Sequence, residues 1–125
     1  MTPNFKRGTI NRYTILRVEN GAGALVDITG RKYRMVVFDE KTKSPFFSAD
    51  ADGVCTVVDD VVTEASVSLE FPAADTVGKT FQNAEFAIYE WRPDGEGGAL
   101  TGPYPKKSGK LTMELWPDGV QAAPT

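Results

Sequence analysis

The chain has 125 residues, the usual size of one domain and too short for two ordinary ones. Its composition, with 41% hydrophobic and 25% charged residues, allows a buried core without a metal or a disulfide. The formal net charge of −3 and the lack of a dominant basic block argue against a nucleic-acid partner. No apolar stretch approaches the ~20 residues of a membrane span, so we expect no membrane partner.

Twelve glycines and 8 prolines divide the chain at short intervals, which favours many short strands over a few long helices. Runs of β-branched and aromatic residues lie between these breaks and predict strands. In chain order, we expect strands at residues 5–10, 13–18, 31–38, 45–48, 54–58, 66–71, 84–92 and 107–116. A single helical turn is expected at 72–78, which a proline opens and a glycine closes. Residues 50–53 and 93–98 are expected to form turns or loops.

Alternation along the strands separates an inner face from an outer face, because successive side chains of a strand point to opposite sides. The inner face is expected to carry Tyr33, Met35, Val37, Val67, Leu69, Phe71, Ala84, Phe86, Ile88, Leu111, Met113 and Leu115. This pattern predicts an all-β fold, an immunoglobulin-like antiparallel β-sandwich of about seven to eight strands. We expect a single domain over residues 1–125, with its core at about 5–116 and a loose tail at 117–125.

The chain contains no histidine and a single cysteine, Cys55. This composition excludes the usual Ser-His-Asp and Cys-His nucleophilic sites and the usual zinc and copper sites. We therefore expect no catalytic residue, no metal and no cofactor, and a protein that is not an enzyme. Cys55 lies among valines and is expected to be a small buried hydrophobe. The unpaired cysteine and a start without a signal-like apolar run favour synthesis in the cytoplasm.

Five carboxylates, Asp50, Asp52, Asp59, Asp60 and Glu64, lie close together in the sequence. The segment 50–53 partly matches a calcium loop, but the twelve-residue spacing with its closing glutamate is missing. No carboxylate is marked as buried and proton-bearing, which a glycoside hydrolase would need. The favoured interpretation is therefore a solvated turn, with a calcium loop as the weaker alternative.

Several large apolar residues alternate with the inner residues along their strands and are therefore expected to point away from the core. They are Val36, Phe38, Tyr89, Trp91 and Trp116. The third, sixth and seventh strands of an immunoglobulin-like sandwich share one sheet, so these side chains are expected on its outer surface. A monomer seldom exposes such an apolar patch, which makes the five residues a candidate protein-interaction site. The alternatives are a parity error on one strand and a loop that covers the patch.

A series of short motifs follows the same order as in a known family. The segments are 27–30, 32–37, 50–53, 67–71, 72–76, 84–90 and 108–113. They resemble the immunoglobulin-like domain of tailed-phage baseplate and tail-associated proteins, the type seen at the N-terminus of baseplate upper proteins. Residues 27–30 match its aspartate-hydrophobe-threonine-glycine entry to the third strand, and residues 109–111 match its glycine-lysine-hydrophobe start of the last strand. The resemblance covers about residues 8–115 and implies a structural module of a virion.

The leading hypothesis is therefore a virion structural protein, made in the host bacterial cytoplasm, that binds other tail, baseplate or fibre proteins. Further copies of the chain itself are possible partners. A capsid decoration protein is the nearest alternative. A carbohydrate-binding module for host recognition is the second, because Tyr89, Trp91, Tyr104 and Trp116 are able to stack on sugars.

Overall fold

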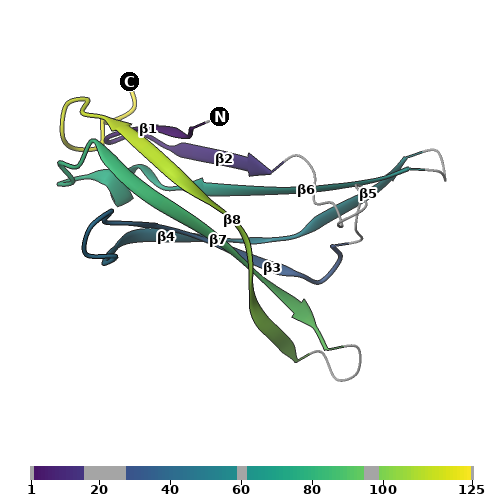
Figure 1. The fold of residues 1–125 in the computed structure, drawn as a ribbon. Helices are drawn as coiled ribbons and strands as arrows, with labels where there is room; N and C mark the ends of the chain where they lie inside the picture. The colour runs from purple at the N-terminus through teal and green to yellow at the C-terminus, as the bar shows by residue number, and fades with distance from the viewer. Residues whose placement is uncertain (1, 16–27, 59–61, 95–98, 125) are drawn as a thin grey trace.

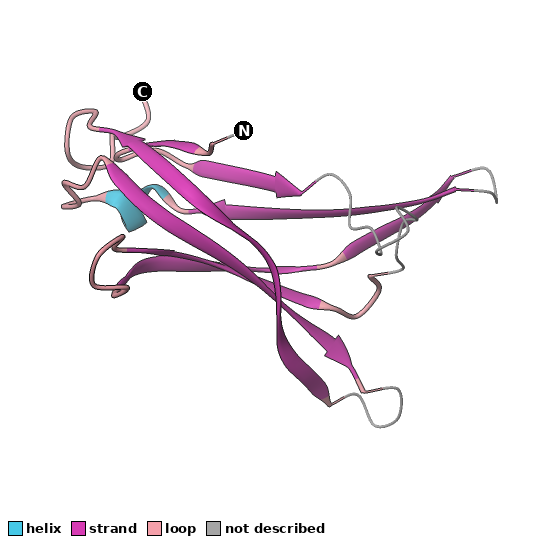
Figure 2. Cartoon of the chain, viewed as in Figure 1, coloured by secondary structure: helices cyan, strands magenta, loops and turns pink. Residues whose placement is uncertain are grey.

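The computed structural model describes residues 2–15, 28–58, 62–94 and 99–124 (Figure 1). It contains strands and one short 3-10 helix, as Figure 2 shows. In chain order the elements are β1 (Asn4–Lys6), β2 (Asn11–Ile15), β3 (Lys32–Phe38), β4 (Pro45–Asp52), β5 (Val54–Val58), β6 (Val62–Phe71), η1 (Ala73–Thr76), β7 (Asn83–Pro93) and β8 (Leu100–Glu114). The predicted all-β class is confirmed, and η1 confirms the predicted helical turn.

The strands form two sheets. One has five strands in the order β1-β8-β7-β3-β4, and the other has three in the order β2-β6-β5. Strand β3 shares its sheet with the last two strands, as expected for the sandwich. All pairs are antiparallel except β1 with β8, which run parallel from Asn4↔Thr112 to Lys6↔Glu114. The larger sheet is therefore mixed, because the first strand lies along the last one.

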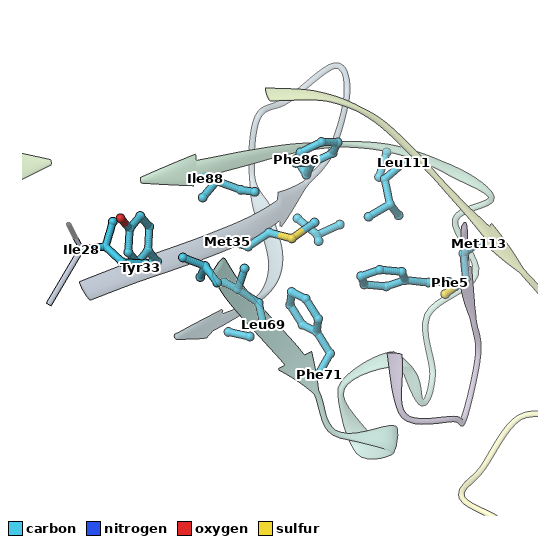
Figure 3. Packing of buried hydrophobic residues seen from close by; sticks show 14 residues of the cluster. Phe5, Ile28, Tyr33, Met35, Leu69, Phe71, Phe86, Ile88, Leu111 and Met113 are labelled. Atoms are coloured by element: carbon cyan, nitrogen blue, oxygen red, sulfur yellow. The ribbon is translucent and has the colours of Figure 1, made fainter. Parts of the chain in front are cut away.

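The core lies between the sheets, where side chains from β1, β3, β6, β7 and β8 point toward one another (Figure 3). Burial confirms eleven of the twelve predicted inner residues, which are Tyr33, Met35, Val37, Val67, Leu69, Phe71, Ala84, Phe86, Ile88, Leu111 and Met113. The prediction for Leu115 is wrong, since this residue is 41% exposed. Strand β8 ends at Glu114, and the two-residue period has no meaning beyond that point.

The prediction of a turn at residues 50–53 is wrong, because strand β4 extends to Asp52. The strand continues through Asp50 and Asp52, because each carboxylate pairs with a cation on the neighbouring strand β3. Arg34 binds Asp50, and Lys32 binds Asp52. Only Gly53 separates β4 from β5, and at this residue the chain passes from the larger sheet to the smaller one.

Strand β8 begins earlier than predicted, at Leu100 rather than at residue 107. The strand runs through residues 102–105, where its ladder with β7 shifts register. The distal part of this hairpin, residues 92–94 and 99–105, projects beyond the ladder with β3, and we call it the arm (Figure 1). Every residue from 99 to 105 is exposed.

The predicted first strand, 5–10, ends at Lys6, after which the chain turns through Gly8 with a φ of 77°. This turn packs against the C-terminal segment. A Cβ on Gly8 would lie 2.5 Å from the carbonyl oxygen of Gly119. The Nε atom of Arg7 donates to the carbonyl oxygen of Trp116 at 2.9 Å, and the Gly78 amide donates to Asp118 at 2.9 Å. Asp118 and Gly119, in the segment expected to be a loose tail, are thus held against the domain.

Candidate functional site

The outer face of the five-stranded sheet carries four of the five predicted interaction residues. Val36 and Phe38 lie on β3, and Tyr89 and Trp91 lie on the adjacent strand β7. All four are half-buried and lie opposite the core. Tyr89 and Trp91 are in contact, with ring centroids 6.4 Å apart. The structure therefore brings these four residues onto one face, while their role in binding stays a prediction.

Trp116 does not belong to this group, and its predicted position on the same sheet face is wrong. It lies two residues beyond the end of β8, in the segment that packs on the β1–β2 turn. Its side chain is 46% exposed. The prediction extended the alternation of β8 to Trp116, but the strand ends at Glu114. Nothing in the local sequence marks Glu114 as the last paired residue.

Charged pairs divide the apolar residues of the sheet face. Lys43 binds Glu85 at 2.6 Å and lies 5.6 Å from the centre of the Phe38 ring. Arg34 holds Asp50 with two hydrogen bonds of 2.6 and 3.1 Å, and its guanidinium lies 5.5 Å from the centre of the Trp91 ring. The hydrogen bonds from Arg34 also lower the pKa of the Asp50 carboxyl. The face is thus a mixed polar and aromatic surface rather than a continuous apolar patch.

A groove of about 640 Å³ opens at the arm end of this face. Two rows of residues cross strands β4, β3 and β7 here, and each row has an acid, a base and an aromatic ring. The rows are Asp52, Lys32 and Trp91, and Asp50, Arg34 and Tyr89. Leu100, the first residue of β8, lines the groove from the arm, together with both ion pairs and Trp91.

The large apolar side chains that are most exposed lie at the two ends of the molecule. Among the described residues they are Ile10, Val77, Leu100, Tyr104, Leu115, Trp116 and Val120. Leu100 and Tyr104 lie on the arm. The other five come from the β1–β2 turn, the residue after η1 and the segment after β8, and we call them the terminal patch. Figure 1 shows these three segments at the end near both termini, opposite the arm.

A buried carboxylate that sequence reasoning missed lies at the base of the arm. Glu90 is fully buried and accepts hydrogen bonds from the Tyr33 hydroxyl, from Arg92 at 2.6 Å and from Arg31 at 3.2 Å. The Nζ atom of Lys106 lies 3.9 Å from it. Phe86 and Ile88 point inward on β7, and the same alternation continued by two residues predicts that Glu90 also points inward.

The environment of Glu90 keeps its carboxylate charged. Burial alone would raise its pKa, but the hydrogen bonds from Tyr33 and Arg92 and the charges of Lys106 and Arg31 outweigh burial and lower it. Burial and the bond to Glu90 also raise the pKa of the Tyr33 hydroxyl. A carboxylate that stays ionised and is already paired is a poor general acid. The cluster therefore fastens the arm to the sandwich.

Within the described ranges, no group of three or more His, Cys, Asp or Glu residues is placed to hold a metal ion. Asp59 and Asp60 lie outside these ranges, as do the side chains of Cys55 and Glu64, and the expectations for them stay predictions. Among the helices of the described part, none is long and apolar enough to cross a membrane.

Comparison with known proteins identifies no relative. No family model matches the chain, and no match is found among curated proteins or solved structures. The resemblance to phage tail domains accordingly stays an expectation based on the sequence motifs.

Proposed function

We propose that this chain is a structural, non-enzymatic protein that binds other proteins in a virion, as part of a tail, baseplate or fibre. The observation that carries the proposal is that the segments with the exposed apolar residues lie at opposite ends of the molecule. Apolar surface of this kind tends to be covered by a partner. A subunit with one such surface at each end is suited to join two neighbours in an assembly. The order of the sequence motifs supports the virion as the setting.

The terminal patch is the better-built of the two ends. Its three segments are tied together through the hydrogen bonds of Arg7 and Asp118 and through a bond from the Gly8 amide to the Thr76 hydroxyl. A surface that is already ordered loses little conformational entropy on binding. Trp116 is the largest side chain of the patch, and tryptophan is among the residues that most often anchor interfaces. The terminal patch is therefore our first candidate for the contact, with Trp116 as its anchor.

The sheet face with Val36, Phe38, Tyr89 and Trp91 is the second candidate contact. Its side chains are half-buried and interrupted by ion pairs, so less apolar area is free there. A polar and aromatic surface is still typical of protein interfaces that form and dissociate. The two candidates predict different effects of substitution and are tested together.

The test compares Trp116→Ala and Trp91→Ala in virions assembled with each variant. We expect Trp116→Ala to leave the melting temperature nearly unchanged, since an exposed residue contributes little to stability. Its incorporation into particles should fall by about thirtyfold, which corresponds to a hot spot of ~2 kcal/mol. Incorporation is measured by mass spectrometry of purified particles.

Each result has a definite meaning. A loss of incorporation with Trp91→Ala alone would move the contact to the sheet face. Absence of the wild-type chain from purified particles would contradict the proposed function. Electron microscopy of the particles gives position and copy number, which separate a tail component from a capsid decoration protein.

A further inference from the structure

The groove at the arm end of the sheet face has a chemistry that assembly contacts do not require. Its two ion pairs are well exposed, with side-chain exposures of 50% and 73% for Lys32 and Asp52 and of 47% and 65% for Arg34 and Asp50. Exposed pairs of this kind contribute little to stability, commonly ~0–1 kcal/mol. Their polar atoms are accessible from the groove, beside the ring of Trp91.

The arrangement repeats the same three chemical groups in two adjacent rows. In each row a carboxylate on β4 lies next to a cation on β3, which lies next to an aromatic ring on β7. The rows are two residues apart along each strand, which is about 7 Å. Both ion pairs line the groove, and of the two outer rings Trp91 lines it, so a ligand there would meet hydrogen-bond acceptors and donors from both rows and one aromatic surface.

We propose that this groove binds a neutral oligosaccharide. A sugar hydroxyl both donates and accepts hydrogen bonds, so it needs acceptors and donors side by side, as the Asp50–Arg34 and Asp52–Lys32 pairs provide. The C–H face of a sugar ring is apolar and fits against Trp91, while Leu100 closes the groove from the arm. This site goes beyond the proposed assembly role and does not depend on it.

The charges of the groove favour a neutral ligand over an anionic one. Two carboxylates and two cations face it, so the lining has no net charge. A phosphate or sulfate drawn to either cation would also meet the adjacent carboxylate, which repels it. The volume of about 640 Å³ lies within the ~300–1,000 Å³ typical of small-molecule sites, which suits a short oligosaccharide.

Binding is measured with the tryptophan of the groove as the reporter. The chain has two tryptophans, so Trp116→Phe leaves Trp91 as the sole source of tryptophan fluorescence. This variant is titrated with neutral oligosaccharides of glucose, galactose, mannose and N-acetylglucosamine, and with sulfated and sialylated ones. The panel is chosen after screening the wild-type chain on a glycan array. We expect a saturable change in emission with a neutral oligosaccharide and none with the anionic ones.

Variants then locate the site. Calorimetric titration of Asp50→Asn, Leu100→Ser and Trp91→Ala should show affinity at least tenfold weaker than wild type. Glu85→Gln is the matched control, since its pair with Lys43 lies on the same sheet face outside the groove lining, and its affinity should be unchanged. Leu100 is 45% exposed on the arm, so Leu100→Ser keeps the test decisive even if another variant is unstable.

Three outcomes would overturn the saccharide site: no neutral oligosaccharide binds the wild-type chain, only sulfated or sialylated ones bind, or binding survives in Asp50→Asn and Leu100→Ser. Failure of the site is distinguishable from failure of the proposed assembly role. Particle incorporation of the Asp50→Asn variant reports on assembly in the absence of sugar and should equal that of wild type.

Discussion

Glu90 is the one charged side chain that is fully buried among the described residues. Its carboxylate joins Tyr33 and Arg31 near β3, Arg92 on β7 and Lys106 on β8 at the base of the arm. Moving an ion out of water costs several kcal/mol unless partners compensate. Here the partners come from three strands, so the cluster sets how these strands meet.

Replacing Glu90 with glutamine keeps the size of the side chain but removes its charge. We expect Glu90→Gln to lower the free energy of unfolding by about 3 kcal/mol, because Arg31, which is mostly buried, loses the charge that compensates its desolvation. Urea unfolding at neutral pH measures the change. In the control Glu85→Gln, the lost pair with Lys43 is exposed, and the change should stay below about 1 kcal/mol. Equal losses in the two variants would contradict the role of the buried cluster.

The same carboxylate predicts how stability depends on pH. The pKa of Glu90 in the folded chain is below its ordinary value, so its contribution is complete above the unfolded pKa of about 4.3. The contribution of Glu90 to the free energy of unfolding is lost as the pH falls from about 4.3 through the pKa of Glu90 in the folded chain. Wild type should therefore lose stability on acidification below about pH 4.3, and Glu90→Gln should lose less over the same range. Parallel acid titrations of both proteins would show this difference as stabilities that converge when the pH falls below about 4.3.

At the scale of elements, Gly53 is the point where one extended segment changes sheets. Strand β4 belongs to the larger sheet and β5 to the smaller one, with Gly53 alone between them. A Cβ at this position would lie 2.7 Å from the carbonyl oxygen of Ile28 and 3.1 Å from the Tyr33 ring. Ile28 and Tyr33 are both buried, so neither has room to move aside.

We therefore expect Gly53→Ala to destabilise the domain by about 1–3 kcal/mol, the usual cost of overpacking. Thermal or urea unfolding measures it. Ser48→Ala, an exposed position on β4, is the control and should stay within ~0.5 kcal/mol of wild type. A Gly53→Ala protein as stable as this control would mean that the two sheets meet differently at this junction.

At the scale of the whole molecule, the exposed apolar side chains lie at the two ends, while ion pairs cover the sheet face between them. A net charge of −3 adds a weak mutual repulsion between copies. We expect the isolated chain to sediment as a monomer or a weak, low-order oligomer at micromolar concentration. A tight, large, closed ring of the purified chain would contradict this expectation.

The sequence by itself determined the all-β class and the faces of the central strands. Alternation placed Met35, Leu69 and Phe86 in the core and left Tyr89 and Trp91 outside, because the two-residue period depends only on the local backbone. The turn after Pro72 was also predictable from local sequence, since proline is favoured at the start of a helical turn.

Only the tertiary structure decided which residues lie opposite one another. Asp50 and Asp52 looked like a turn until Arg34 and Lys32, 16 and 20 residues earlier, were seen to pair with them across the ladder. The end of β8 at Glu114 separates Trp116 from the sheet face. The pairing of β7 with β3 and with β8 brings Arg31 and Lys106 to Glu90, beside Arg92 of its own strand. These features depend on contacts between distant segments, which a local period does not encode.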